Sequence, residues 1–316
     1  MSDLDPQPLP PLGTDASPAP LQTGGHEVLA ARSFLVGEGT EVRRLLPQRR
    51  LRTVGAWCFA DHYGPDDVVD GEGMQVPPHP HTGLQTVSWL LEGEIVHRDS
   101  LGSLQRVGPG ELSLMTSGHG ISHSEESPAD RPPMLSGVQL WVALPEHARD
   151  GEASYEHHTE LPVVRHGPLT ATVVLGQHVG VVSPGTTHSP LVGLDVQVDG
   201  EAHLPLEPTW EHVAFVLDGH ALVDGQELAV GSALHLPAGH DALPLSASGA
   251  RVMLLGGEPL GEPLVMWWNF VCRSGEEVAQ AREDWQSGSR FGTVVGYRGP
   301  RLPAPPLGPS RLLPRS

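Results

Sequence analysis

Two short segments of the chain carry side chains that can bind a metal ion. The first holds His79 and His81 with one residue between them, and the second holds His123 and Glu125 with the same spacing. In a β-strand, alternate side chains project from one face, so each segment would direct two ligands to the same side of a sheet. If the two strands lie close together in one barrel wall, three imidazoles and one carboxylate converge. The chain is therefore predicted to act through a bound metal.

The elements that must position these side chains are predicted to be short β-strands. The 316 residues include 38 Gly and 32 Pro, and only 18% are charged, a composition that favours turns and short strands over helices. Apolar runs bounded by Gly or Pro are the clearest strand candidates, and they cover residues 84–91, 112–115, 138–144, 163–175, 192–198 and 213–217. This spacing is typical of barrels and sandwiches, so the fold class is predicted to be all-β.

One short helix is predicted near the end of the chain. Ser274 and Glu277 have the spacing of a capping box, and Gly288 can end the helix. The apolar residues that would share its buried face are Val278, Ala281 and Trp285. The helix is expected to be a packing element.

The length favours two domains, because domains usually contain about 100 to 200 residues. We expect an N-terminal domain over residues 25–147 and a C-terminal domain over 148–297, with a polar connector near their boundary. Residues 1–24 and 298–316 are rich in Pro and poor in residues that could form a core. These two segments are expected to be disordered tails, because they bury too little to offset the entropy of ordering.

Charge and composition exclude several classes of function. A formal net charge of -19 opposes nonspecific binding to nucleic acid or to anionic lipid. Cys58 and Cys272 are too few for a disulfide framework, and the sequence has neither a signal peptide pattern nor a run of apolar residues long enough to span a membrane. A cytoplasmic, monomeric protein is expected.

Longer runs surround the two histidine segments. They are PPHPHTGLQTVSWLLEGEIVHRDSLGS, VGPGELSLMTSGHGISHSEES and GVQLWVALP in the first half, with LLGGEPLGEP and EEVAQA in the second. Together they resemble the pirins, a family of bicupin proteins in the cupin superfamily, over most of residues 25–297. The resemblance implies two tandem cupin barrels of the jelly-roll type, followed by the short helix.

The resemblance also implies a ligand set. The glutamate of the first cupin motif would fall three or four residues after His81, where this chain has Gln85 or Thr86, and neither is an anionic ligand. Pirins are understood to take their carboxylate from a His-x-Glu position in the second motif instead. The ligands implied here are His79, His81, His123 and Glu125.

The second half resembles a cupin without the metal chemistry. Gly231 with Pro237 and Gly239 fits the second cupin motif, but no His-x-His pair precedes Gly219 at the right distance. The resemblance implies a C-terminal cupin without metal. His119 is expected to shape the loop before His123. Other histidines are assigned to the surface or to ordinary hydrogen bonds, and these include His97, His147, His157, His158, His166, His178 and His188.

Three imidazoles and a carboxylate suit one divalent transition metal, with Fe(II) the first expectation and Mn, Co, Ni, Cu or Zn also compatible. Several pirins are associated with quercetin 2,3-dioxygenase activity, in which the flavonol 3-hydroxyl is deprotonated and dioxygen opens the heterocycle with loss of carbon monoxide. The implied partners are a flavonol-like aromatic molecule and dioxygen, with Glu125 as the catalytic base. If the first strand continues without a bulge, Gln85, Val87 and Trp89 face the same way as His81. Core packing is the expected role of Val87 and Trp89.

A different class of function stays open. Some pirins are described as regulators that bind transcription factors or metabolic enzymes, with the metal controlling the shape of a surface. A metal-stabilised structural bicupin is a third possibility, although structural ions seldom leave coordination positions open. Fold and ligands alone do not decide between an enzyme and a regulatory protein.

Overall fold

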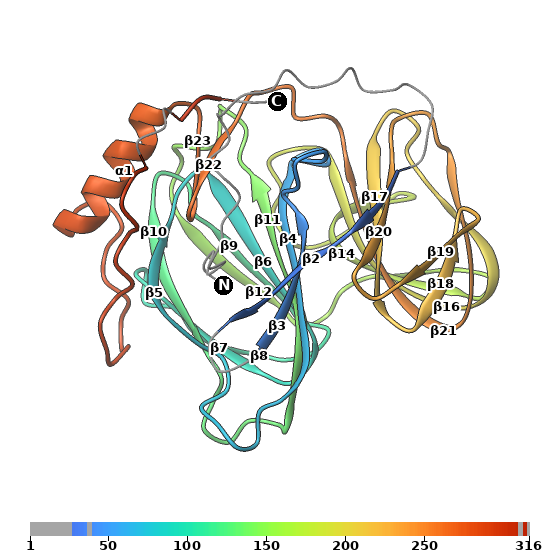
Figure 1. Cartoon of the computed structure of the whole chain (residues 1–316), viewed down its shortest axis with the longest axis horizontal. Coiled ribbons are helices and arrows are strands. Elements are labelled where there is room, and N and C mark those ends of the chain that lie inside the picture. The colour runs from blue at the N-terminus through green and yellow to red at the C-terminus, as the bar shows by residue number, and fades with distance from the viewer. Residues whose placement is uncertain (1–26, 37–39, 309–311, 315–316) are drawn as a thin grey trace.

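A computed structural model describes residues 27–36, 40–308 and 312–314 of the chain. Two β-barrels lie side by side, and one helix packs on the outer side of the first barrel (Figure 1). This architecture confirms the expected all-β class with a short C-terminal helix. Within the described ranges, no helix combines the length and the apolar character needed to cross a membrane. The predicted tail over residues 1–24 lies outside the described residues.

The first barrel consists of two antiparallel sheets that face each other. Its seven-stranded sheet has the order β12 (Ser154–His158), β9 (Leu112–Thr116), β6 (Leu84–Glu92), β11 (Met134–Ala143), β4 (Trp57–Asp67), β3 (Thr40–Leu46) and β2 (Arg32–Val36). Its four-stranded sheet has the order β5 (Gln75–His81), β10 (Ile121–Glu126), β7 (Ile95–Asp99) and β8 (Leu104–Val107). The two histidine segments therefore lie in neighbouring strands of the smaller sheet.

The second barrel is formed by one ten-stranded sheet. Its main order is β1 (Glu27–Ala30), β20 (Ser232–Leu236), β17 (Glu211–Asp218), β21 (Ala242–Gly257), β16 (Leu191–Pro205), β14 (Leu169–His178) and β13 (Val163–His166). The remaining strands are β15 (Val181–Val182), which pairs with β14, and the hairpin of β18 (His220–Val223) and β19 (Gln226–Ala229). Strands β16 and β21 pair along their whole length with one register shift, and this long ribbon spans the barrel.

Strand pairing crosses the domain boundaries expected from the sequence. Strand β1, at the start of the predicted N-terminal domain, pairs with β20 of the second barrel, with Glu27 opposite His235. Strand β12, beyond the predicted boundary at residue 147, pairs with β9 of the first barrel, with Ser154 opposite Thr116. Each barrel thus contains a strand from the other segment, because an edge strand pairs with whichever exposed edge it reaches.

The two barrels share one hydrophobic core cluster that includes Trp57 and Trp89 from the first and Leu255 from the second. The indole Nε1 of Trp57 lies 3.2 Å from the carbonyl oxygens of both Val192 and Gly256. The indole Nε1 of Trp89 donates to Asp195 Oδ2 at 2.9 Å. Buried indoles whose N–H groups bond across the junction hold the barrels in one arrangement.

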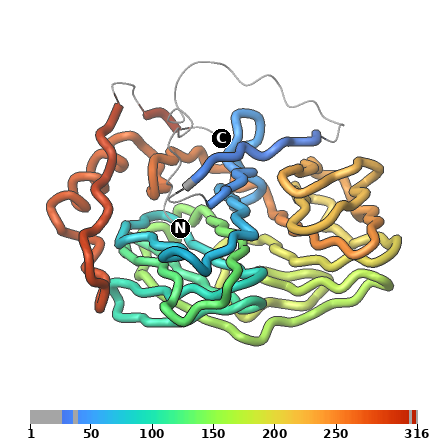
Figure 2. Tube along the Cα trace, turned by 60° about the horizontal axis from the view of Figure 1, so that its bottom comes forward, coloured from blue at the N-terminus to red at the C-terminus, as the bar shows by residue number. Residues whose placement is uncertain are grey.

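The C-terminal segment returns to the first barrel (Figures 1 and 2). The hairpin of β22 (Val265–Trp267) and β23 (Phe270–Cys272) leads into α1 (Gly275–Ser287), and Phe270 bridges Thr82 next to the end of β5. Gly83 is required at this contact, since it has φ +73° and a Cβ there would lie 2.0 Å from the Val271 carbonyl oxygen. The Ser274 side chain caps α1 by accepting from Glu277 N, as predicted.

Part of the predicted disordered tail over residues 298–316 is packed against the protein instead. The Trp285 indole donates to the Leu302 carbonyl at 2.8 Å, and Leu302 N donates to the Pro78 carbonyl at 2.8 Å. The Arg301 guanidinium lies 4.3 Å from the centroid of the Trp285 ring. These contacts hold residues 301–304 between α1 and β5, because Trp285 of the helix offers an aromatic surface to the segment. The composition of the segment itself gives no sign of this surface.

Candidate metal centre

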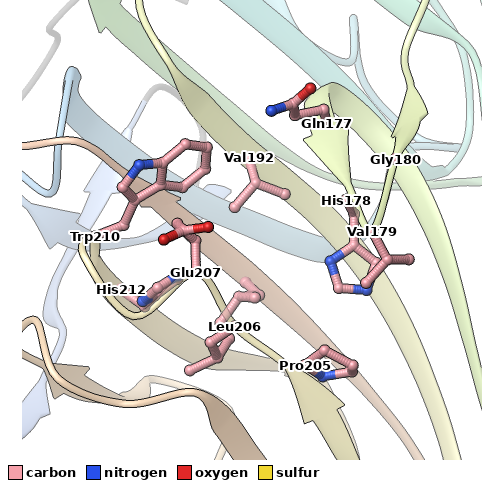
Figure 3. A pocket seen from close by; sticks show the side chains of 11 residues that line it. Gln177, His178, Val179, Gly180, Val192, Pro205, Leu206, Glu207, Trp210 and His212 are labelled. Carbon is pink, nitrogen blue, oxygen red and sulfur yellow. The ribbon is translucent and has the colours of Figure 1, made fainter.

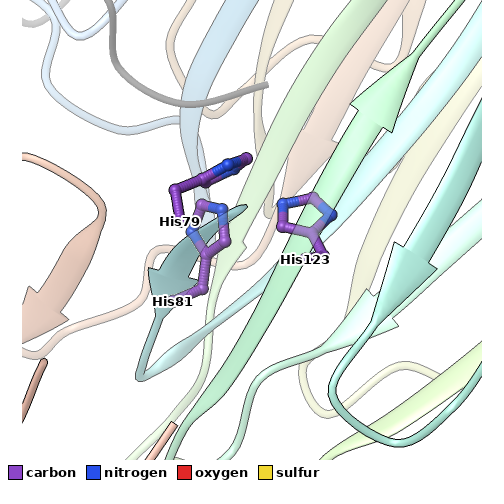
Figure 4. Close-up of side chains that lie close together, drawn as sticks. All are labelled: His79, His81 and His123. Carbon is purple, nitrogen blue, oxygen red and sulfur yellow. The ribbon is translucent and has the colours of Figure 1, made fainter. Parts of the chain in front are cut away.

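Three histidines converge inside the first barrel. His79 and His81 project from β5, and His123 projects from β10, which pairs with β5 so that His123 lies opposite His79 (Figure 4). The ring centroid of His79 is 4.4 Å from that of His123 and 5.0 Å from that of His81, and His81 is 4.9 Å from His123. One nitrogen from each ring lies within 4.8 Å of the other two. The i, i+2 spacing therefore places these side chains as the sequence predicts.

The local sequence of β5 sets this geometry. Pairing with β10 shifts register between His123 and Glu125, because β5 has an extra residue between Val76 and His79. The extra residue falls at Pro77 and Pro78, which lack the N–H that a regular ladder needs. The Nδ1 of His79 lies 2.8 Å from the Pro77 carbonyl, so it carries the proton and leaves Nε2 with a lone pair.

All three imidazoles are neutral at physiological pH. His79 and His81 are 0% exposed and His123 is 1% exposed. Burial lowers the pKa of His79 to about 3. Burial, followed by the nearby imidazoles, holds the pKa values of His81 and His123 well below their ordinary range. Neutral imidazole is the form that coordinates a metal.

The unpaired nitrogens of the cluster fit a bound cation. The Nε2 atoms of His79, His81 and His123 are buried and have no hydrogen-bond partner among the residues that the structure describes. A buried polar atom without a partner costs about 1–3 kcal/mol, and three such atoms aimed into one space are unusual in a folded protein. A divalent transition metal would satisfy all three at once, and imidazole nitrogen is a suitable ligand for such metals.

Glu125, the fourth predicted ligand, lies in the same barrel but outside this group of three nitrogens. Its carboxylate is buried, and its Oε1 accepts from Ser88 Oγ at 3.0 Å across the barrel. The same hydroxyl lies 2.9 Å from the side-chain oxygen of Gln139, whose Nε2 is buried and has no partner in the described part of the chain. A hydroxyl has one hydrogen, so rotating the Gln139 amide lets Gln139 donate to Ser88 and Ser88 donate to Glu125.

Three residues around His123 were not expected from the sequence as functional residues. His97 on β7 is buried, with Nδ1 3.4 Å from His123 Nδ1 and Nε2 3.1 Å from Asp99 Oδ2. The His97 ring stacks on Tyr155 of β12, with centroids 4.1 Å apart. The His-x-Asp spacing of residues 97 and 99 was the available signal, since it places both side chains on one face of a strand.

The expected orientation of β6 is wrong. The strand that carries His81 ends there, and β6 begins at Leu84 after the turn at Gly83, so the two strands do not share one alternation. Ser88, not Val87 or Trp89, faces Glu125. Val87 and Trp89 instead belong to the core between the barrels, which confirms their packing role.

Gln85, one of the two residues that could stand where the resemblance would place a glutamate, bonds across the barrel junction. Its Nε2 donates to Thr116 Oγ1 at 2.8 Å and to the Thr186 carbonyl at 3.1 Å. The His119 side chain is exposed, and its Nδ1 lies 3.7 Å from Asp150 Oδ1. These contacts direct both side chains to partners other than the histidine cluster.

The second barrel contains histidines in a different setting (Figure 3). His178 and His212 line a cavity of about 220 Å³ together with Trp210. Burial lowers the pKa values of His178 and His212 to about 4. His178 Nε2 lies 3.1 Å from His166 Nε2, so the two rings pair with each other.

Comparison with known proteins relates both halves to one family. The family model described as Pirin matches residues 39–142, and that described as Pirin C-terminal cupin domain matches residues 191–292. A Pseudomonas aeruginosa protein named "Putative quercetin 2,3-dioxygenase PA1205" is 44% identical over 283 residues, which cover 88% of this chain and 90% of that protein.

Solved structures show the same relationship. A quercetin 2,3-dioxygenase from Acinetobacter baumannii has a TM-score of 0.86 and 42% identity, covering 90% of this chain and 96% of that one. The Escherichia coli pirin YhhW, solved in complex with nickel(II), has a TM-score of 0.60 and 19% identity over 74% of this chain and 100% of that one, so it shares the fold. With family matches to both barrels and a histidine cluster in the first, this chain belongs to the pirin family of bicupin proteins.

Proposed function

We propose that this protein is a metal-dependent dioxygenase of the quercetin 2,3-dioxygenase type. In this proposal, His79, His81 and His123 hold one metal ion and Glu125 supplies the fourth ligand and the catalytic base. The observation that carries the proposal is the convergence of three neutral imidazoles whose Nε2 atoms have no partner among the described residues. The similarity to proteins named as quercetin dioxygenases supports a flavonol and dioxygen as the substrates.

We propose Fe(II) as the native metal. Nitrogen ligands of this kind also accept Mn, Co, Ni, Cu and Zn, and affinity alone favours the later metals of the series. When bound, the metal supplies Lewis-acid and redox chemistry toward the flavonol and dioxygen. Cellular supply then decides which metal the site contains.

In this proposal, protein side chains accept the substrate proton and hold the metal ion in position. Glu125 is buried on β10, two residues after His123, and in this proposal its carboxylate accepts the proton of the flavonol 3-hydroxyl. Ser88 holds one oxygen of that carboxylate at 3.0 Å and so fixes its orientation. The three imidazoles, held on two paired strands, hold the ion at a constant position relative to this base.

The test is oxygen uptake with quercetin after anaerobic loading of the metal-free protein with Fe(II), Mn(II), Co(II), Ni(II), Cu(II) or Zn(II) in separate samples. The proposal expects quercetin-dependent uptake and release of carbon monoxide with at least one redox-active metal. Absence of uptake with every metal, in samples shown to contain one metal per chain, would refute the dioxygenase assignment and favour a regulatory role that depends on the metal without turnover.

Two variants separate binding from chemistry. His81→Ala removes one ligand and should abolish stoichiometric metal. Glu125→Gln keeps the acceptor for Ser88 but removes the base, so oxygen uptake should fall by about 10²–10⁴-fold. If metal content also falls in Glu125→Gln, this carboxylate is a ligand; full activity in that variant would remove its role as base.

A further inference from the structure

We propose that Asp99 and His97 set the tautomer of His123, so that its Nε2 presents a lone pair to the metal. Both are positioning residues, since they act through His123 and not on a substrate. The inference rests on the proposed metal centre and concerns the residues behind one of its ligands. It follows from a chain of contacts that runs from Asp99 through His97 to His123.

The orientation of Asp99 is fixed by the backbone that follows it. Its Oδ1 accepts from the backbone N–H groups of Leu101 and Ser103, at 2.9 Å each. Its Oδ2 is directed toward His97 Nε2 at 3.1 Å. A carboxylate can only accept hydrogen bonds, so the hydrogen of this contact must be on His97 Nε2.

The contact between Asp99 and His97 determines which ring nitrogens of His97 and His123 carry hydrogens. A neutral His97 with its hydrogen on Nε2 has a lone pair on Nδ1, and that Nδ1 lies 3.4 Å from His123 Nδ1. Two ring nitrogens attract only if one of them carries a hydrogen, so His123 must donate from Nδ1. Its Nε2 then has a lone pair, and this is the buried atom that lacks a partner among the described residues.

The surrounding structure keeps His97 in the required orientation. Strand β7 pairs with β10 in regular register, with Asp99 opposite His123. The His97 ring stacks on Tyr155 with an interplanar angle of 10°, and the Tyr155 hydroxyl is 3.0 Å from Ser113 Oγ. Outer partners that fix the orientation and tautomer of a metal-binding histidine are a common feature of metal sites, and their loss costs 10- to 100-fold in affinity or activity.

The isosteric substitution Asp99→Asn should reverse the direction of the hydrogen bonds from residue 99 through His97 to His123. The amide oxygen would stay at the two N–H groups of Leu101 and Ser103, because only an oxygen can accept there. The amide NH₂ would then face His97 and donate to its Nε2. His97 would carry its hydrogen on Nδ1 and donate to His123, and His123 would hold its hydrogen on Nε2, where it blocks coordination.

The experiment measures tautomers and metal affinity separately. Histidine side-chain ¹⁵N spectra of the full-length, metal-free protein report which nitrogen of His97 and His123 carries hydrogen. We expect Nε2–H on His97 and Nδ1–H on His123, and the reverse in Asp99→Asn. Competition of Co(II)-loaded protein against a chelator should show a 10- to 100-fold larger dissociation constant for Asp99→Asn. Asp130→Asn makes the same chemical change at an exposed aspartate and should match the unsubstituted protein.

Substitutions at residue 97 separate this positioning role from simple packing. His97→Phe retains a ring to stack on Tyr155 but removes both nitrogens, so it should weaken Co(II) binding as much as Asp99→Asn does. His97→Gln restores an acceptor for His123 and a donor for Asp99, and it should recover most of the affinity.

Three results would overturn the inference. The first is Nε2–H on His123 in the unsubstituted metal-free protein. This measurement does not depend on the folding of any variant. The second is an unchanged tautomer or affinity in Asp99→Asn, and the third is equal affinity in His97→Phe and His97→Gln. If the unsubstituted protein binds no Co(II), the proposed metal centre fails as well, whereas Co(II) binding without oxygen uptake refutes only the dioxygenase.

Discussion

Replacing His81 with leucine should move stability in opposite directions with and without metal. Leucine is close in volume to histidine but has no polar atom, so it removes the metal ligand together with both unpaired ring nitrogens. In the metal-free protein, Nδ1 and Nε2 of His81 are both buried without a hydrogen-bond partner among the described residues. Removing them should recover at least about 1–3 kcal/mol of unfolding free energy, the cost of one unsatisfied buried group.

The ring contact of His81 offsets part of this gain. His81 meets the Trp141 ring edge-on, with centroids 5.2 Å apart, and loss of an aromatic pair of this kind costs about 0.5–1.5 kcal/mol. The net change in the metal-free state is therefore expected to lie between about -0.5 and 2.5 kcal/mol in favour of the variant. At about 2–4 °C per kcal/mol, the Tm should stay unchanged or rise by several degrees.

With metal present, the unsubstituted protein should become more stable than His81→Leu. A ligand that binds only the native state at 100 times its dissociation constant stabilises by about 2.7 kcal/mol, so the Tm of the unsubstituted protein should rise by about 5–11 °C. His81→Leu retains two of the three nitrogens and should gain little at the same metal concentration. Thermal unfolding with and without Ni(II), followed by circular dichroism, measures both effects in one series.

A matched control is available in the second barrel. His220 on β18 is exposed, so His220→Leu should leave the metal-dependent rise in Tm intact. The reasoning is refuted if metal-free His81→Leu loses more than about 1 kcal/mol of unfolding free energy, which lies outside the predicted range. It is also refuted if Ni(II) raises the Tm of His81→Leu as much as that of the control.

The remaining predictions concern pH and packing. His178 and His212 have pKa values of about 4, against an ordinary value of 6.5. Between pH 6.5 and about pH 4, these histidines therefore bind protons in the unfolded state but not in the native state. Each should lower the unfolding free energy by about 1.4 kcal/mol per pH unit over this range. In either His→Gln variant, the unfolding free energy measured with urea should fall less steeply as the pH is lowered. The same pH dependence as in the unsubstituted protein would contradict this assignment. Gly83→Ala should destabilise by more than 1 kcal/mol and expose the C-terminal hairpin to proteolysis, because its backbone has φ +73°. Trp89→Phe removes the 2.9 Å bond to Asp195 and should lower the unfolding free energy by about 1.5–3 kcal/mol, whereas a change within 0.5 kcal/mol would show that this bond contributes nothing.

Features that depend on nearby residues were predictable from the sequence. The helix follows its local pattern, because the Ser274 cap and the buried Val278 and Trp285 all lie within one short segment. The convergence of His79 and His123 was predictable because alternate residues of a strand share a face and the two segments belong to motifs that pair in this fold.

Features that depend on long-range pairing were not predictable. The turn at Gly83 ends one strand and starts another, which changes the alternation and makes Ser88 the residue that faces Glu125. Composition gave no indication that residues 301–304 pack on Trp285, because the surface they contact belongs to another part of the chain. His97 was assigned to an ordinary role because its partner His123 lies on a neighbouring strand.

The most direct test of the metal centre is the X-ray absorption spectrum of the protein loaded with one Zn(II) per chain. The structure leads us to expect three imidazole nitrogens in the first coordination shell, at about 2.0–2.1 Å from the metal. His81→Ala, prepared in the same way, should retain less than one Zn(II) per chain. A first shell made of oxygen atoms alone, without the scattering pattern of imidazole rings, would contradict the assignment of His79, His81 and His123 as ligands.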